Sequence, residues 1–237
     1  MPRFSEQDQQ METRTLASQA ALVSTVAKEI SQLIENHDGV QFNLVVSGGG
    51  LGIRTIEELG KLINTPELLR IMFCDERYVA AESPDRNEHQ ALSVWPLISN
   101  CEFLRYPQPP TPLHGAGQLV SEQLSRLYGE LTAEKSVFDL VLLGVGEDGH
   151  IASLFPNALH PAAWIVAEGN SPKPPRERLS MSYQAINRAE RVWFVVGGSA
   201  KAEVLRGLRN GKDLPVGRVR GAKETIWWLD QELSDAL

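Results

Sequence analysis

Four short segments of the sequence carry residues suited to binding an anion or transferring a proton. They are SGGG at 47–50, DER at 75–77, GEDGH at 146–150 and GGSAK at 197–201. Glycine amides can approach a phosphate closely, an imidazole or a carboxylate can exchange protons, and lysine or arginine can neutralise an anion. Together these residue types predict an anion-binding catalytic site.

His150 is the candidate general base of this site. It comes just after a hydrophobic run and two residues after Asp148, whose carboxylate could fix the tautomer of the imidazole. A loop histidine without a chemical role is the alternative, but the glycine-rich segment favours catalysis. The other histidines have no metal-ligand spacing with His150, and HExxH is absent. We therefore expect neither a metal nor another cofactor.

The glycines at 48–50 and Lys201 are candidate phosphate-binding residues. No Gly-Lys-Ser/Thr follows the glycines, and the third glycine of the dinucleotide fingerprint is missing, so a P-loop and a dinucleotide site are both excluded. A tight turn between a strand and a helix is the alternative. Lys201 is expected in the first turn of a helix capped by Ser199, where a cation is unfavourable unless an anion lies nearby. A solvated ion pair with Glu203 is the alternative there.

Asp75 and Arg77 follow another hydrophobic run, and we expect both to point into the same crevice. Surface ion pairs are the alternative, as for any run of charges. Ser83-Pro84-Asp85 is expected to cap a helix from Asn87 to Val94, with Pro84 at its first position. Contact of this segment with a substrate is the other interpretation.

Strands and helices are predicted to alternate along the chain. Hydrophobic runs without polar alternation are typical of buried parallel strands, and spacings of three and four are typical of helices. Strands are expected at 42–46, 71–74, 138–145, 192–196 and 225–229. A long helix is expected from 16 to an end near Asp38-Gly39, and further helices at 53–62, 87–94, 119–131, 183–188 and 201–208. We predict an α/β fold with a mainly parallel, doubly wound sheet and helices on both faces. The four segments would then share the carboxyl edge of that sheet, where ligands bind.

Composition limits the classes of protein that the chain could belong to. With 237 residues, 42% hydrophobic and 22% charged, we expect a single domain over 1–237, with 1–11 as a flexible tail; two small domains are the alternative. A net charge of −7 argues against nucleic acid and anionic membranes as partners. Two cysteines are too few for a disulfide framework, and neither a signal segment nor a membrane-spanning run is visible. These features predict a cytoplasmic protein.

Four longer strings resemble the 6-phosphogluconolactonase family. They are FCDERYVAAESPDRNEHQA at 73–91, FDLVLLGVGEDGHIASLFP at 138–156, SPKPPRERLSMS at 171–182 and VVGGSAKAEVL at 195–205. The resemblance implies a three-layer α/β sandwich, which that family shares with glucosamine-6-phosphate isomerases. The isomerases continue their Asp-Gly-His string with Ala-Phe-Asn-Glu-Pro and have Tyr in place of Arg77, so the lactonase is favoured. One departure is GLG at 50–52, where many family members have Ser-Thr-Pro.

The resemblance also implies a reaction, namely the hydrolysis of 6-phospho-D-glucono-1,5-lactone to 6-phosphogluconate without a cofactor. His150 would activate water, Asp148 would orient the imidazole, and Asp75 and Arg77 would complete the catalytic set. Arg77 would stabilise the oxyanion or bind substrate hydroxyls. The residues expected to bind the substrate and its phosphate are Ser47, Gly48, Gly49, Gly50, Asn87, Arg178 and Lys201.

Three further expectations follow. A nucleophile elbow GxSxG is absent, so no covalent intermediate is expected. The partner is a small phosphosugar lactone, and the protein is expected to be a monomer or a weak homodimer. An isomerase or deaminase on the same fold and a non-catalytic sugar-phosphate sensor remain alternatives; Leu154-Phe155 weakens the first, and the acidic balance weakens the second.

Overall fold

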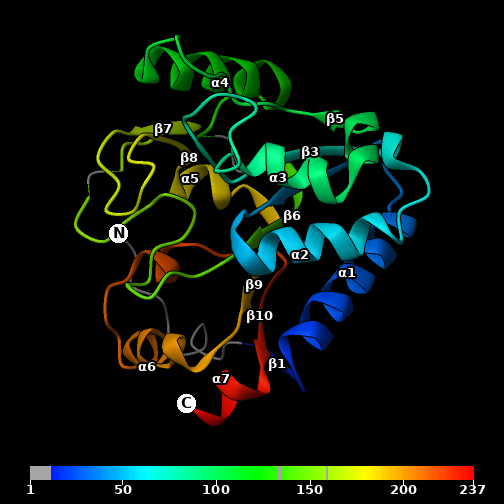
Figure 1. Cartoon of the computed structure of the whole chain (residues 1–237), viewed down its shortest axis with the longest axis vertical. Helices are drawn as coiled ribbons and strands as arrows, with labels where there is room; N and C mark the ends of the chain where they lie inside the picture. Colours follow the sequence, from blue (N-terminus) through cyan, green and yellow to red (C-terminus); the bar gives the residue numbers. More distant parts are fainter. Residues whose placement is uncertain (1–11, 133–134, 159) are drawn as a thin grey trace.

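A computed structural model describes residues 12–132, 135–158 and 160–237 of the chain (Figure 1). The expected flexible tail at 1–11 lies outside these residues. Seven strands form one parallel sheet in the order β1-β10-β9-β6-β2-β3-β5. These strands are β1 Glu12–Leu16, β2 Phe42–Val46, β3 Leu69–Phe73, β5 Glu102–Phe103, β6 Phe138–Leu143, β9 Ala189–Val196 and β10 Glu224–Asp230. The predicted α/β fold with a mainly parallel sheet is confirmed.

Helices pack on the sheets, and the longer ones carry buried hydrophobic residues along one side. The α-helices are α1 Gln19–Glu35, α2 Gly49–Gly60, α3 Asn87–Val94, α4 Leu113–Tyr128, α5 Tyr183–Ile186, α6 Ala202–Arg209 and α7 Gln231–Asp235. Single 3-10 turns are η2 Pro66–Leu68, η3 Pro96–Asn100, η4 Ser199–Lys201 and η5 Pro215–Arg218. In the described part of the chain, no helix is both long and apolar enough to cross a bilayer.

Several element boundaries differ from the prediction. The segment from Glu12 to Leu16 is an edge strand paired with β10, whereas Leu16 was expected to begin a helix. Helix α1 begins only at Gln19, because the Ser18 hydroxyl accepts the backbone N–H of Ala21 at 3.2 Å and so caps the helix. Helix α4 begins at Leu113, six residues before the hydrophobic spacing becomes clear at Leu119.

A second, three-stranded antiparallel sheet of order β4-β8-β7 was not predicted. Its strands are β4 Asp75–Arg77, β7 Ile165–Glu168 and β8 Arg178–Met181, and helix α4 packs against it (Figure 1). Residues 75–77, for which no strand was expected, therefore form one, since they pair with β8 over their whole length. Strand pairing fixes the backbone from which Asp75 and Arg77 project.

Cys74 is the residue of the chain that joins β3, in the large sheet, to β4, in the small sheet. Its N–H donates to the carbonyl of Val46 on β2 at 2.8 Å, and its carbonyl accepts the N–H of Met181 on β8 at 2.8 Å. The large and small sheets are thus hydrogen-bonded to the same residue.

The four segments singled out above lie where expected. Strands β2, β3, β6 and β9 are parallel, so their carboxyl ends share one edge of the sheet, and the segments 47–50, 75–77, 146–150 and 197–201 follow those ends. The strands themselves are buried, with Leu44, Val45, Leu140 and Val141 at most 1% exposed. The strand ends that carry the site therefore extend from a buried hydrophobic core.

Candidate active site

The loop after β6 is shaped to hold His150. The N–H of Gly146 donates to the carbonyl of His150 at 2.8 Å, and the N–H of Gly149 donates to the carbonyl of Gly146 at 3.0 Å. Gly149 has φ +84°, a conformation that favours glycine. A Cβ at Gly146 would lie 2.0 Å from the imidazole ring. Both glycines are therefore needed for the histidine to take this position.

Asp148 and His150 form a hydrogen-bonded pair. Nδ1 of the imidazole lies 2.5 Å from Oδ1 of Asp148, and the ring also packs on Phe155 with centroids 4.8 Å apart. Burial lowers the pKa of His150, and Asp148 opposes this shift. Burial raises the pKa of Asp148, but hydrogen bonds from His150 outweigh it and bring that pKa below its ordinary value. A neutral imidazole with its proton on Nδ1 leaves Nε2 as the basic nitrogen.

Lys201 reaches from the turn after β9 toward the same loop. Its Nζ lies 3.4 Å from Oε1 of Glu147, so the ion pair is with Glu147 and not with Glu203. Lys201 ends η4 and is the N-cap of α6, whereas it was expected inside the first turn. The side chain is 19% exposed.

The expectation that Ser199 caps the following helix is wrong. Its hydroxyl and its N–H both donate to Oε1 of Glu232, at 2.7 and 3.0 Å, and the N–H of Gly198 donates to Oδ2 of Asp230 at 2.9 Å. Carboxylates at the start of α7 thus already occupy the amides of this turn. An anion here would be bound by the Lys201 side chain.

The glycine segment forms the N-terminus of α2. Gly48 is its N-cap, and Gly49 has φ +78°. Among the described residues, nothing lies within 4 Å of the place that a Cβ would take at Gly49 or Gly50, whereas a Cβ at Gly48 would lie 2.0 Å from Oδ1 of Asn87. Open space at a helix N-terminus suits a phosphate group.

The hydroxyl of Ser47 is already hydrogen-bonded to the backbone at the end of β6. Its hydroxyl donates to the carbonyl of Leu142 at 3.0 Å and accepts the N–H of Gly144 at 3.1 Å, and Sγ of Cys74 lies 3.3 Å away. The residue is 6% exposed. Its hydroxyl therefore links β2 to β6 beneath the glycines.

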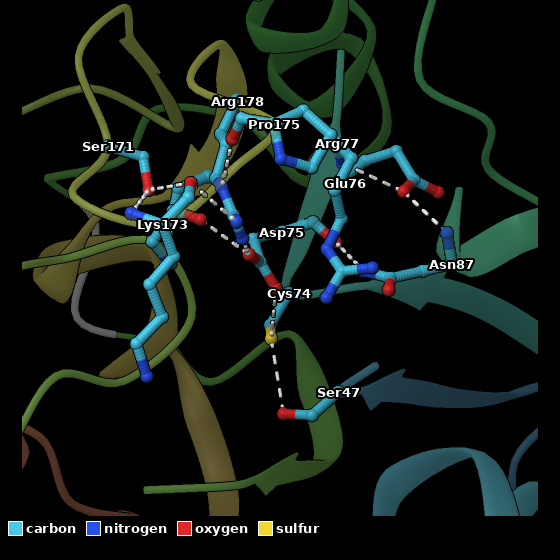
Figure 2. A network of polar contacts seen from close by, with 12 residues as sticks. Ser47, Cys74, Asp75, Glu76, Arg77, Asn87, Ser171, Lys173, Pro175 and Arg178 are labelled. Carbon is cyan, nitrogen blue, oxygen red and sulfur yellow. Dashed lines mark hydrogen bonds and ion pairs between the residues drawn. The ribbon is translucent and has the colours of Figure 1, made fainter. Parts of the chain in front are cut away.

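Asp75 on β4 and Arg178 on β8 form an ion pair between the two strands (Figure 2), whose register places Asp75 opposite Ser180 and Arg178 opposite Arg77. Oδ2 of Asp75 lies 3.9 Å from Nη1 of Arg178 and accepts the hydroxyl of Ser153 at 2.5 Å. Arg178 also donates to three carbonyls of the proline-rich loop, those of Lys173, Pro174 and Pro175 at 3.2, 3.2 and 3.0 Å. Burial lowers the pKa of Arg178, and Asp75 opposes that shift. Most donors of Arg178 thus fix the loop.

Arg77 and Asn87 each carry a buried polar atom without a hydrogen-bond partner among the described residues. Nη1 of Arg77 donates to the carbonyl of Asp85 at 2.6 Å and Nδ2 of Asn87 donates to the carbonyl of Asp75 at 2.9 Å, whereas Nε of Arg77 and Oδ1 of Asn87 stay unpaired. Buried polar groups are nearly always hydrogen-bonded, so this donor and this acceptor are open to a polar group of a ligand or to water.

Sequence reasoning missed three residues around this site. The hydroxyl of Ser153 holds Asp75, Glu147 pairs with Lys201, and the charge of Lys173 lies close enough to lower the pKa of His150, after the larger effects of burial and Asp148. Ser153 and Lys173 stand within the strings ASLFP and SPKPP. These two strings are the features of the sequence from which Ser153 and Lys173 could have been identified.

A groove of about 590 Å³ lies beside the site, between α4 and β7. Ser153 is part of its wall, but neither His150 nor the glycine segment lines it. In the part of the chain that the structure describes, no group of three or more His, Cys, Asp or Glu side chains is placed to hold a metal ion.

Known proteins include relatives of this chain. Residues 14–228 match the model of the family described as "Glucosamine-6-phosphate isomerases/6-phosphogluconolactonase". A 6-phosphogluconolactonase of Mycobacterium leprae is 33% identical over 211 residues, covering 80% of this chain and 82% of that protein. A 6-phosphogluconolactonase of Synechocystis is 29% identical, covering 92% of each chain.

Solved structures show the same fold. The 6-phosphogluconolactonase of Trypanosoma cruzi superposes with a TM-score of 0.84 at 22% identity, covering 96% of this chain and 97% of that one. A monomeric glucosamine-6-phosphate deaminase superposes with a TM-score of 0.76 at 18% identity, covering 96% and 100%. Because the family model spans most of the sequence, this chain belongs to the family of glucosamine-6-phosphate isomerases and 6-phosphogluconolactonases.

Proposed function

We propose that this chain hydrolyses 6-phospho-D-glucono-1,5-lactone to 6-phosphogluconate, a step of the pentose phosphate pathway. The observation that carries the proposal is the Asp148–His150 pair at the same sheet edge as the open glycine segment and Lys201. Relatives named 6-phosphogluconolactonase support the substrate.

The glycine segment and Lys201 bind the phosphate in this proposal. The amides of Gly48, Gly49 and Gly50 and the positive end of α2 contact its oxygens, and the ammonium of Lys201 neutralises charge. Arg178 acts mainly by holding the proline-rich loop, with only its Nη1 directed toward Asp75. Holding the phosphate fixes the lactone relative to His150, and such orientation supplies a large part of the rate enhancement.

His150 then acts as general base. Nε2 takes a proton from water while the water oxygen bonds to the lactone carbonyl carbon, giving a tetrahedral oxyanion. The bond from that carbon to the ring oxygen breaks, and the ring oxygen takes the proton from the imidazolium to become a hydroxyl. The carboxylate of Asp148 stabilises the imidazolium between these steps. Water attacks directly, so the proposal has no covalent intermediate.

Arg77 and Asn87 are placed to contact the sugar. The unpaired Nε of Arg77 suits the oxyanion or a substrate hydroxyl, and the unpaired Oδ1 of Asn87 suits a hydroxyl donor. Asp75 supports this wall by holding Arg178 and Ser153.

An isomerase or deaminase is the second candidate, because the family and the fold include such enzymes. The segment after His150 argues against it, since Ile151-Ala152-Ser153-Leu154-Phe155-Pro156 holds no glutamate where the resemblance places one in the isomerases.

The deciding experiment follows lactone disappearance directly, with spontaneous hydrolysis subtracted, in the presence and absence of a chelator. Production of fructose 6-phosphate and ammonia from glucosamine 6-phosphate is measured in parallel. We expect lactone hydrolysis that is insensitive to chelation. Hydrolysis no faster than the spontaneous reaction, with or without isomerase activity, would reject the proposal.

We also propose that the protein works in the cytoplasm as a monomer or a weak homodimer. Cys74 and Cys101 are free thiols, which are typical of a reducing compartment. Sedimentation over a range of concentrations tests the oligomeric state, and a stable higher oligomer would contradict it.

A further inference from the structure

Helix α3 begins without a capping side chain of its own. Its N-cap residue, Arg86, makes no side-chain hydrogen bond to the first turn, and the expected cap at Ser83-Pro84-Asp85 is wrong because Ser83 Oγ accepts the N–H of Asp85 instead, at 3.3 Å. The first amides of a helix need an acceptor from elsewhere when they are buried. Those amides belong to Asn87 and Glu88, 1% and 7% exposed.

Glu76 on β4 supplies that acceptor (Figure 2). Its Oε1 accepts the N–H of Asn87 at 2.7 Å and the N–H of Arg77 at 2.8 Å, and its Oε2 accepts the N–H of Glu88 at 2.9 Å. The residue is 1% exposed. A carboxylate from another element thus takes the place of the missing cap and adds a favourable charge at the helix N-terminus.

The three contacts all require Glu76 as an acceptor. Burial raises the pKa of Glu76 to about 7, with the three N–H groups and the charge of Arg86 acting against the shift. The other charged or titratable groups nearby are Asp75 and Arg77 on the same strand, Arg178 on β8, Tyr106, and Glu88 on α3, whose side chain pairs with Arg86 at 3.2 Å. A protonated carboxyl would carry an O–H among N–H donors, so protonation weakens the hydrogen bonds to the three amides, although burial favours the neutral form of the side chain.

Two of the three residues whose amides Glu76 binds, Asn87 and Arg77, line the proposed substrate site. Asn87 holds its unpaired Oδ1 beside Gly48, and its Nδ2 donates to the carbonyl of Asp75 at 2.9 Å. Arg77 follows Glu76 directly and has the unpaired Nε. One buried carboxylate therefore fixes the backbone at both residues.

We propose that Glu76 is a positioning residue for lactone hydrolysis, whose carboxylate holds Asn87 and Arg77 in place for the substrate by capping α3. This inference rests on the proposed function. Glu76 does not contact the reacting atoms; it acts through Asn87 and Arg77, two of the three residues whose amides it binds.

The first test compares wild type with Glu76→Gln by steady-state kinetics between about pH 5.5 and about pH 8.5, a range that spans the titration of a carboxyl of this kind. Gln keeps one acceptor oxygen but turns an N–H₂ toward an N–H. We expect kcat/KM of the variant to be about 10-fold lower at the alkaline end, as for other residues that orient a catalytic group. The ratio of wild type to variant should fall toward one as pH drops through about 7, because the wild-type cap becomes protonated.

Glu88→Gln is the matched control. It removes a buried carboxylate from the same helical turn but leaves the N–H contacts of Glu76 intact, so its ratio to wild type should not vary with pH in this way. A Glu76→Gln ratio that is constant across the range, or equal to that of Glu88→Gln, would overturn the inference.

The second test needs no variant. Opening of the α3 N-terminus that exposes Glu76 to water returns its pKa toward 4.5, so the free energy of that opening rises as pH falls through about 7. Hydrogen exchange at the amides of Asn87 and Glu88 in wild type, corrected for the intrinsic pH dependence, should therefore slow over that range, and unchanged protection would overturn the inference. The proposed function fails separately, by an inactive wild-type enzyme, whereas an active wild type with unaffected Glu76→Gln rejects the inference alone.

Discussion

Oδ1 of Asp148 accepts two hydrogen bonds from His150, one from the ring at 2.5 Å and one from the backbone N–H at 3.1 Å. The carboxylate therefore fixes the loop and the ring with one atom. Because the ring donates through Nδ1, the opposite nitrogen is directed away from the pair as an acceptor. The arrangement matches what a general base requires before the substrate arrives.

Replacing His150 by Ala should remove most of the catalysed hydrolysis. Loss of a general base typically lowers kcat by about 10²- to 10⁴-fold. Binding of the product 6-phosphogluconate, measured by calorimetry, should change little because the residues proposed to bind the phosphate lie on other segments. A variant with near wild-type kcat would show that His150 is not the base.

Replacing Asp148 by Asn should move the acid limb of the pH profile. Burial lowers the pKa of His150, and Asp148 raises it partway back, so removing the carboxylate lowers that pKa further. Activity requires the neutral imidazole and falls as pH drops below its pKa; the limb of the variant should therefore lie at lower pH. The maximal kcat should also fall, by about 10²- to 10⁴-fold as in triads that lose their carboxylate. Profiles of kcat/KM for both proteins check this, and a limb displaced to higher pH would be inconsistent with the assigned pair.

Replacing Lys201 by Ala should weaken phosphate binding selectively. A charge-assisted contact contributes about 1.5 to 3 kcal/mol, which corresponds to about 10- to 150-fold in kcat/KM, mainly through KM. Lys61→Ala is the control, because it removes an exposed lysine beyond the other end of α2. It should leave kcat/KM unchanged on both substrates. Kinetics on the phosphorylated lactone and on gluconolactone decide the matter: equal losses on both substrates would exclude Lys201 as a phosphate ligand.

Protein stability should depend on the titration of Glu76. Its pKa is raised from 4.5 to about 7 in the folded protein, so the folded state binds this proton between those values and the unfolded state does not. The stability contribution of Glu76 is therefore greatest at acidic pH and is lost as pH rises through about 7, by on the order of 3 kcal/mol.

Glu76→Gln does not titrate, so its unfolding free energy relative to wild type should increase between about pH 5 and about pH 8. Urea denaturation of both proteins at the two pH values measures the change. A difference that stays constant would show that the buried carboxyl does not titrate in this range.

Much of the fold was predictable because the central strands are hydrophobic on both faces. Runs such as Phe42–Val46 and Phe138–Leu143 have few other structural options, and parallel pairing then aligns their ends. Strand β4 was not predictable, since Asp75–Arg77 is only three residues long, entirely charged, and paired through contacts about a hundred residues away in the chain. A single domain over 1–237 stays a prediction.

In the site, too, contacts between residues close in sequence were predictable, and contacts between distant residues were not. The spacing of Asp148 and His150 is local, so the sequence predicts their contact. The bond between Ser153 and Asp75 joins residues 78 positions apart, and the cap that Glu76 provides joins β4 to α3, so neither pattern is visible in a linear reading. The cap at Ser199 was wrong for a related reason: Glu232, distant in sequence, binds its hydroxyl.

The position of Cys74 between the two sheets has a dynamic consequence. Its N–H is bound to β2 and its carbonyl to β8, so the strand carrying Asp75 and Arg77 is hydrogen-bonded, through a single residue, to the strand that ends at the glycines. Movement of β4 against the large sheet at this junction would break one of these two hydrogen bonds. We therefore expect the wall formed by β4 to keep its position during turnover, and any closing motion to come from the loops.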